Sequence, residues 1–260
     1  MAATLNSMAD VSKPGSAELL YARAGQMGLA PVWLIRGQLM SVTTNEGLRY
    51  LHHAKSELNS QLSSSLTRDK LATRRILEQH GLPSIPSIKP DSQGEAERFL
   101  DTHSKIIVKP LEGSNCRDVN IVETQERLVL FNITKYLLEK YINGREFRYL
   151  LLDGQIIGVH ESEYGGSVSE TRSLQRISYP RAEWSPALME LSLKVARILR
   201  LRYAAVDFLI DEQGHARILE VNSSPGMKWF HAPTSGPEID VAGLFLETFM
   251  AKQQPANALD

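Results

Sequence analysis

The sequence has little cysteine, no excess of charge and no long apolar segment. Its 260 residues include one cysteine, Cys116, which excludes an intrachain disulfide framework and a zinc site built from several cysteines. Lysine and arginine total 29 against 30 aspartates and glutamates, so nucleic acid and anionic membranes are not expected as partners. The N-terminus lacks an apolar signal core, and no stretch is long enough to span a bilayer. These absences favour a soluble, cytoplasmic protein.

The apolar residues that are present predict both helices and strands. They make up 42% of the chain, a normal globular share. Helical spacing predicts helices over residues 17–29, 48–62, 69–81 and 186–199. Apolar and β-branched runs predict a buried strand over 30–37 and hairpin strands within 104–111, 119–123, 137–161, 204–211 and 216–222. Residues 161–173 lack periodicity and predict a mobile loop, and residues 1–15 predict a flexible tail.

These elements favour an α+β fold rich in antiparallel hairpins. The dipeptide Asp153-Gly154 between two apolar runs is a hairpin signal, and Ser185-Pro186 is a good cap and first-turn pair for the helix that follows. A regular alternation of strand and helix is missing, which argues against a Rossmann fold or a TIM barrel.

Two late strands carry oxygen-bearing side chains. Asp207 interrupts one apolar strand, and Glu220 and Asn222 lie two residues apart in the next. If the strands pair as a hairpin, the three side chains share one face. Hard oxygen ligands of this kind suit Mg²⁺, which proteins hold with one or two carboxylates plus substrate phosphates. The alternative is that the acids lie at strand ends and face water. The triple favours the metal interpretation.

Two lysines and one hinge-like segment could hold a nucleotide. Lys109 ends an apolar strand before a Gly-Ser turn, and Lys70 follows Asp69 at a helix start, so either could neutralise phosphate oxygens. The segment EKYINGREF places Glu139 and Glu146 in a strand-turn-strand that could present groups to a base and a sugar. Taken alone, each feature is better explained by surface lysines and an ordinary edge hairpin.

In order and spacing, these motifs resemble the ATP-grasp superfamily of carboxylate-amine ligases. The resemblance runs from about residue 67 to 247, through "DK" at Asp69, "VKP..GS" at Val108, "EKYI.GREFR" at Glu139 and "VDFLID…ILEVNSSPGM". The sequence is most similar to the RimK-type glutamate ligases, glutathione synthetase and cyanophycin synthetase. The resemblance to D-alanine-D-alanine ligase, which has the same spacing of hinge and metal residues, is more distant, because Ala205 stands where those ligases place an arginine.

The resemblance implies an ATP-grasp fold, in which two α+β lobes hold ATP between them, preceded by a shortened N-terminal α/β domain. Its implied divisions are a tail at 1–15, the truncated domain at 16–66, an N-lobe at 67–138, a C-lobe with the metal site at 139–250 and a tail at 251–260. The implied ATP contacts are Lys70, Lys109, Ser114, Glu139, Tyr141, Ile142 and Glu146. The implied metal ligands are Asp207, Glu220 and Asn222, which would hold two Mg²⁺ ions, with Mn²⁺ as a substitute.

The implied reaction joins a carboxylate to an amine through an acyl phosphate, giving an amide, ADP and phosphate. Arg148 and Arg172 are candidates for holding a substrate carboxylate or acyl-phosphate oxygens, and Lys228 for contacting an acidic substrate. Solvated surface side chains are the alternative for each. The expected partners are an amino acid or peptide with a carboxylate, and an amine acceptor. A second copy or a partner subunit could complete the short N-terminal domain.

Two departures from the family pattern keep other functions open. The phosphate loop reads GSNCRDV, where relatives have a glycine-rich GS.G.GV, and bulkier residues restrict close backbone approach. The region before Asp69 is short, and in this superfamily that region contributes to the acceptor site. These features motivate a second hypothesis, an ATP-binding protein without ligase turnover. A small-molecule kinase on the same fold, such as an inositol phosphate kinase, is a third, although the near-neutral charge disfavours polyanionic substrates.

Overall fold

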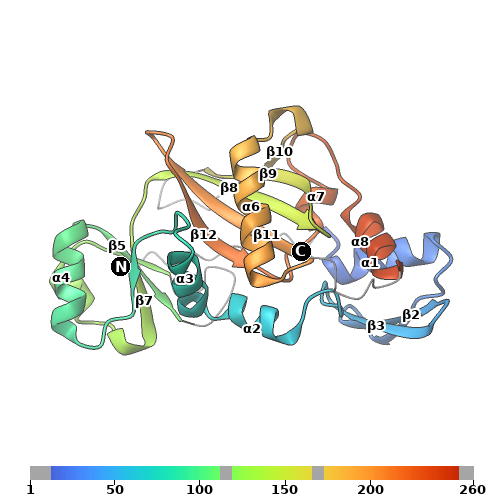
Figure 1. Cartoon of the computed structure of the whole chain (residues 1–260), viewed down its shortest axis with the longest axis horizontal. Coiled ribbons are helices and arrows are strands. Elements are labelled where there is room, and N and C mark those ends of the chain that lie inside the picture. The colour runs from blue at the N-terminus through green and yellow to red at the C-terminus, as the bar shows by residue number, and fades with distance from the viewer. Residues whose placement is uncertain (1–12, 112–118, 166–172, 252–260) are drawn as a thin grey trace.

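Three antiparallel sheets lie side by side along the long axis of the molecule (Figure 1). The structure, a computed structural model, describes residues 13–111, 119–165 and 173–251. The predicted α+β class is confirmed, because helices pack on sheets whose neighbouring strands are all antiparallel. Within the described ranges, no helix combines the length and apolar character that a bilayer crossing requires.

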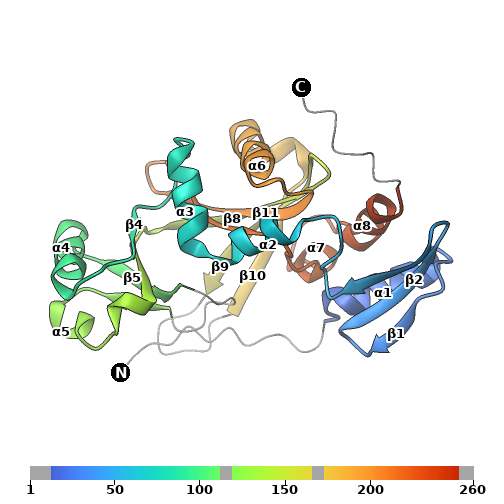
Figure 2. The same ribbon diagram turned by 60° about the horizontal axis from the view of Figure 1, so that its bottom comes forward.

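The N-terminal sheet has three strands in the order β1-β2-β3 and lies beside one helix from each end of the described chain (Figure 2). Its elements are α1 (Ser16–Gln26), β1 (Val32–Ile35), β2 (Leu39–Thr44), β3 (Gly47–His52) and α8 (Val241–Met250). The helix predicted over 48–62 is wrong, because Gly47, at a φ of 110°, follows a tight turn that pairs β3 with β2. The strand predicted as buried at 30–37 is mostly exposed, since β1 is an edge strand.

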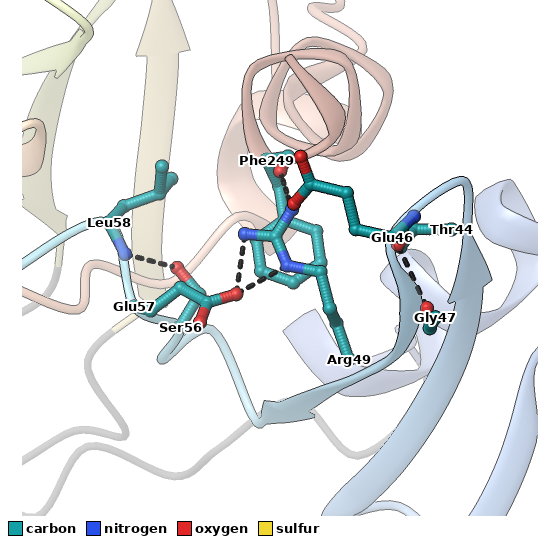
Figure 3. A network of polar contacts seen from close by, with 8 residues as sticks. All are labelled: Thr44, Glu46, Gly47, Arg49, Ser56, Glu57, Leu58 and Phe249. Atoms are coloured by element: carbon teal, nitrogen blue, oxygen red, sulfur yellow. Dashed lines mark hydrogen bonds and ion pairs between the residues drawn. The ribbon is translucent and has the colours of Figure 1, made fainter. Parts of the chain in front are cut away.

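Arg49 on β3 connects this sheet to α8 (Figure 3). Its guanidinium donates to the backbone oxygen of Phe249, lies 3.8 Å from the centre of the Phe249 ring and pairs with Glu57. The turn before β3 is closed by Thr44, whose hydroxyl donates to the oxygen of Gly47 at 2.8 Å. The two ends of the described chain are therefore joined by polar contacts as well as by packing.

The second sheet has four strands in the order β4-β7-β5-β6. Its strands and helices are β4 (Ser87–Ile88), α4 (Gln93–His103), β5 (Ile106–Pro110), β6 (Asn120–Val122), α5 (Gln125–Leu128), a 3-10 turn (Ile133–Lys135) and β7 (Tyr136–Lys140). Ala96 and Leu100 of α4 pack on Ile106, Val108 and Leu138 of the sheet in a separate small core. This sheet contains the predicted strands at 104–111 and 119–123.

The third sheet has five strands in the order β10-β9-β8-β11-β12. Its strands are β8 (Gly144–Leu152), β9 (Gln155–Gly165), β10 (Ser173–Ser178), β11 (Tyr203–Asp211) and β12 (Ala216–Asn222). The associated helices are α2 (Gln61–Arg68), α3 (Lys70–Gln79), α6 (Pro186–Leu199), α7 (Lys228–His231) and a 3-10 turn (Arg181–Glu183). The loop predicted over 161–173 is wrong at both ends, because β9 continues to Gly165 and β10 begins at Ser173; residues 166–172 lie outside the described ranges.

Alternation along these strands gives the five-stranded sheet two different faces. One face is apolar: Tyr149, Leu151, Val206 and Phe208 pack against α3 and α6. On the opposite face, Leu150, Leu152 and Tyr203 join the core shared by α1, β2 and α8, while the rest of that face carries polar side chains. The predicted domain borders at 66/67 and 138/139 fall within α2 and β7, so neither coincides with a break between elements.

Candidate active site

Polar side chains form a row across all five strands on the open face of the third sheet. Asp207 on β11 lies directly opposite Glu220 on β12 and Arg148 on β8. Arg148 lies opposite His160 on β9, which lies opposite Ser178 on β10. Residues paired directly across antiparallel strands share a face, so the five side chains form one continuous polar row. The predicted pairing of the two carboxylate strands is thus observed.

The carboxylate end of the row is held by an ion pair. Arg148 donates from Nε and Nη2 to the two oxygens of Asp207 at 2.7 and 2.6 Å. Asp207 is only 2% exposed. The sequence predicts that Arg148 holds a substrate carboxylate or acyl-phosphate oxygens; in the structure its guanidinium orients Asp207, a predicted metal ligand. Asn222 lies opposite Ala205, and its Oδ1 accepts a hydrogen bond from the Ser224 amide at 2.9 Å.

This donor set fits a hard divalent cation. Burial raises the pKa of Glu220, and the neighbouring Asp207 charge raises it further. A bound cation would relieve that repulsion, and each carboxylate oxygen retains a lone pair beside its existing bonds. In the part of the chain that is described, no three His, Cys, Asp or Glu side chains cluster as a closed metal cage. Two carboxylates and an amide are instead the open arrangement typical of Mg²⁺ shared with phosphates.

A buried triad positions Lys109. Glu139 on β7 is 2% exposed, and its Oε2 lies 2.6 Å from Lys109 Nζ while its Oε1 accepts from Arg74 Nη2 at 2.8 Å. Burial alone would raise the pKa of Glu139, but Lys109 and Arg74 together hold that pKa below its usual value. Both carboxylate oxygens are therefore occupied by cations from β5 and α3.

Arg74 also connects the second and third sheets. It donates from Nη1 to the oxygen of Ile218 and from Nη2 to the oxygen of Leu219, both at 2.6 Å, so one guanidinium joins Glu139 to β12. Arg74 is not among the residues that the sequence motifs predict for the site. The available signal was its helical position, because Arg74 lies one turn before Leu77 on the face of α3 that the apolar spacing marks as buried.

The predicted phosphate lysines and a predicted metal ligand line one small pocket. Its walls are Thr67, Lys70, Thr73, Arg74, Lys109, Leu219, Glu220 and Val221. Residues from α2, α3, β5 and β12 therefore meet where the second and third sheets approach each other. Two lysines can neutralise the oxygens of a polyphosphate, and the neighbouring carboxylate can bind the divalent cation that such a polyphosphate carries.

The predicted hinge connects these two sheets. Residues 141–143 run from the end of β7 to the start of β8. Tyr141 is held by its amide, which donates to the Lys105 oxygen at 3.1 Å, and its ring lies 4.4 Å from Lys105 Nζ. Ile142 is partly exposed. Glu146 lies on the site face of β8 and accepts from Ser162 Oγ at 3.1 Å.

The remaining predicted residues lie elsewhere. Lys228 begins α7, where its Nζ is 5.0 Å from the Trp229 ring, and it is not part of the row. Ser114, Cys116 and Arg172 lie outside the described residues.

A RimK-like ATP-grasp domain model matches residues 67–248, a range that contains every strand of the polar row and both pocket lysines. The chain belongs to this family. The resemblance seen in the motifs is therefore confirmed, and the ATP-grasp fold with it.

Relatives of the chain include proteins named probable alpha-L-glutamate ligases. The one from Aeromonas salmonicida is 30% identical over 214 residues, covering 77% of this chain and 70% of the relative. The one from Shewanella halifaxensis is 27% identical over 211 residues, covering 75% of this chain but 44% of the relative. The chain thus spans less than half the length of some curated relatives that it matches.

A solved structure of the ATP-grasp ligase PsnB with a minimal precursor superposes on this chain with a TM-score of 0.63. The two are 19% identical, and the match covers 75% of this chain and 62% of PsnB. At that identity the likeness establishes the fold.

Proposed function

We propose that this RimK-like ATP-grasp protein is an ATP-dependent carboxylate-amine ligase that acts on an amino acid or a peptide. The observation that carries the proposal is the convergence of two lysines on the open face where Glu220 and Asp207 pair. Phosphoryl transfer needs groups placed in this way, because catalysis there consists mostly of positioning and charge stabilisation.

In this proposal, Lys70 and Lys109 contact the ATP phosphates, the hinge at Tyr141 and Ile142 holds the base and Glu146 binds the ribose. Asp207, Glu220 and Asn222 would hold two Mg²⁺ ions, with Mn²⁺ as a substitute. When bound, the metal supplies positive charge that stabilises the phosphate oxygens. A structure of PsnB, on the same fold, contains Mg and ADP. Glu139 acts indirectly, by fixing the Lys109 ammonium at the pocket.

The reaction proceeds in two steps. A substrate carboxylate oxygen attacks the γ-phosphorus of ATP, the bond to the β,γ-bridging oxygen breaks, and ADP leaves. The amine nitrogen of the acceptor then attacks the acyl carbon, phosphate leaves, and the nitrogen loses one proton to give the amide. Arg148, fixed against Asp207, lies beside the carboxylate end of the row and would offset charge on the transferring oxygens.

The names of relatives guide the choice of substrate. Several relatives carry the name probable alpha-L-glutamate ligase, and PsnB was solved with a precursor peptide. We therefore propose an amino-acid or peptide carboxylate as donor and an amine as acceptor, with the reaction taking place in the cytoplasm. We also propose that a second copy or a partner subunit contributes to the acceptor side of the site.

Trapping with hydroxylamine tests the proposal. The full chain would be incubated with ATP, Mg²⁺ and a panel of amino acids and peptides, because hydroxylamine converts an acyl phosphate to a stable hydroxamate. ADP release together with hydroxamate is the expected result. A stable phosphorylated product without hydroxamate would identify a kinase. Stabilisation by ATP without ADP release from any panel member would identify a binding protein without turnover.

A further inference from the structure

The β9–β10 end of the polar row carries buried side chains that the proposed reaction does not use. His160 is 1% exposed and Ser178 is 2% exposed. Arg176 lies opposite Ser162, which is two residues from His160, so all three side chains are on the site face. None was selected by the sequence motifs.

Several polar atoms of these side chains have no hydrogen-bond partner in the part of the chain that the structure describes. Among the described residues, His160 Nδ1, Ser178 Oγ and two nitrogens of Arg176, Nε and Nη1, are shielded from solvent and make no hydrogen bond. Buried polar groups in native proteins are nearly always paired, and leaving them unpaired costs stability. Several such atoms on adjacent strands indicate that the site is completed by a molecule that it binds.

The surrounding contacts fix this end of the sheet. The Phe230 ring of α7 lies 4.6 Å from the His160 ring. The segment after α7 runs along β10, where the Thr234 amide donates to the Arg176 oxygen at 2.8 Å and the Ser178 amide donates to the Ser235 oxygen at 2.9 Å. The three side chains are thus held by paired backbone on both sides. Arg176 as a whole remains partly exposed, which leaves an approach from solvent.

The charge at this end is positive. Burial, together with the nearby Arg148 and Arg176, holds the pKa of His160 well below its usual value, so the imidazole is neutral at pH 7. Arg148 is already neutralised by Asp207. The nearest acid along the Arg176 row is Glu146, two strands away across Ser162, or about 10 Å at the usual strand spacing. An anion is the complementary ligand.

We propose that Arg176, His160 and Ser178 bind a carboxylate of the substrate, one that is not itself activated. This inference rests on the proposed ligase function. The guanidinium supplies the charge, and the imidazole and hydroxyl supply neutral hydrogen bonds. Ser178 is two strands, about 10 Å, from Arg148. That separation corresponds to at most about three extended residues, at about 3.5 Å each. The preferred substrate therefore carries a second carboxylate within that reach of its reacting group.

Arg176→Met tests the proposal, with Arg197→Met on the exposed surface of α6 as the matched control. Binding of glutarate to the full chain would be measured by calorimetry, with neutral glutaramide as the control probe. Arg176→Met is expected to weaken glutarate binding at least about tenfold, since hydrogen bonds to charged groups are strong. Arg197→Met is expected to bind glutarate as the unsubstituted chain does.

The melting temperature of each variant, measured without glutarate, distinguishes a role in binding from a role in stabilising the fold. Removing unpartnered buried groups should leave the melting temperature of Arg176→Met and Ser178→Ala unchanged or higher, while Ser178→Ala weakens glutarate binding about two- to tenfold. A lowered melting temperature with unchanged glutarate affinity would overturn the proposal, as would absence of glutarate binding to the unsubstituted chain. Stabilisation by ATP and Mg²⁺, measured on the same samples, reports the proposed function separately, because it does not depend on Arg176.

Discussion

Replacing Arg74 by methionine would remove the guanidinium that joins Glu139 to β12 while keeping a side chain of similar length. Glu139 would lose one of its two cations, and the oxygens of Ile218 and Leu219 would each lose a donor at 2.6 Å. Arg74 is 3% exposed, so solvent cannot replace these bonds. Breaking one side of a buried ion pair typically costs about 3–5 kcal/mol.

For a chain of this size, that loss corresponds to a fall in melting temperature of roughly 6–20 °C. The adjacent Arg75 is the matched control, because it pairs with Glu78 at 3.0 Å on the helix surface, with 65% of its side chain exposed. Exposed pairs of this kind contribute about 0–1 kcal/mol. Urea unfolding followed by circular dichroism would give both free energies. Equal losses in Arg74→Met and Arg75→Met would refute the role assigned to the triad.

Three further outcomes follow from the same contacts. Glu220→Gln should abolish ATP turnover with little loss of stability. Asp207→Asn should abolish turnover and also lose up to about 3–5 kcal/mol, because it unpairs the largely buried Arg148; activity and unfolding assays on both variants would show the difference. Gly236→Ala should destabilise the protein by about 1–3 kcal/mol more than Gly214→Ala. Both glycines have positive φ, but only a Cβ at Gly236 would meet a backbone oxygen, at 1.8 Å. Equal losses of stability in the two variants would exclude this clash. The pKa of Glu139 is lower in the folded protein than in the unfolded chain, so its ionised carboxylate stabilises the fold fully above about pH 4.3. That stabilisation is lost as the pH falls through the pKa of the folded state. In Glu139→Gln, the free energy of unfolding should therefore depend less steeply on pH in the acid range.

Part of the site could be predicted from residues that are close together in the sequence. Asp207 and Glu220 lie on consecutive strands joined by a short turn, so their pairing in one hairpin could be predicted. A shift in register between Asp207 and Phe208 is what brings Glu220, rather than Leu219, opposite Asp207, and the sequence pattern does not show it. The helix predicted to begin at residue 69 is capped by Asp69, whose carboxylate accepts a hydrogen bond from the Ala72 amide at 3.0 Å. Predictions of this kind succeed because the partners are close in sequence.

The remaining features depend on pairings between distant segments. Arg148 meets Asp207 only because β8 neighbours β11, and no local pattern specifies that neighbour. The Arg74 triad likewise draws on α3, β5 and β7. The helix predicted over 48–62 was wrong for the same reason, since pairing with β2 and the contacts of Arg49 outweigh its helical spacing.

Because α1 and α8 share a core, the segment that must fold together is longer than the segment that matches the family model. The family pattern covers residues 67–248, yet Leu20 and Ala24 of α1 are fully buried against Phe245 and Phe249 of α8 and against the five-stranded sheet. A fragment cut to the family borders would therefore expose the apolar side of its own last helix. Exchange of the N-terminal region between relatives would have to be accompanied by matched changes in α8, because the two regions supply the two sides of one core.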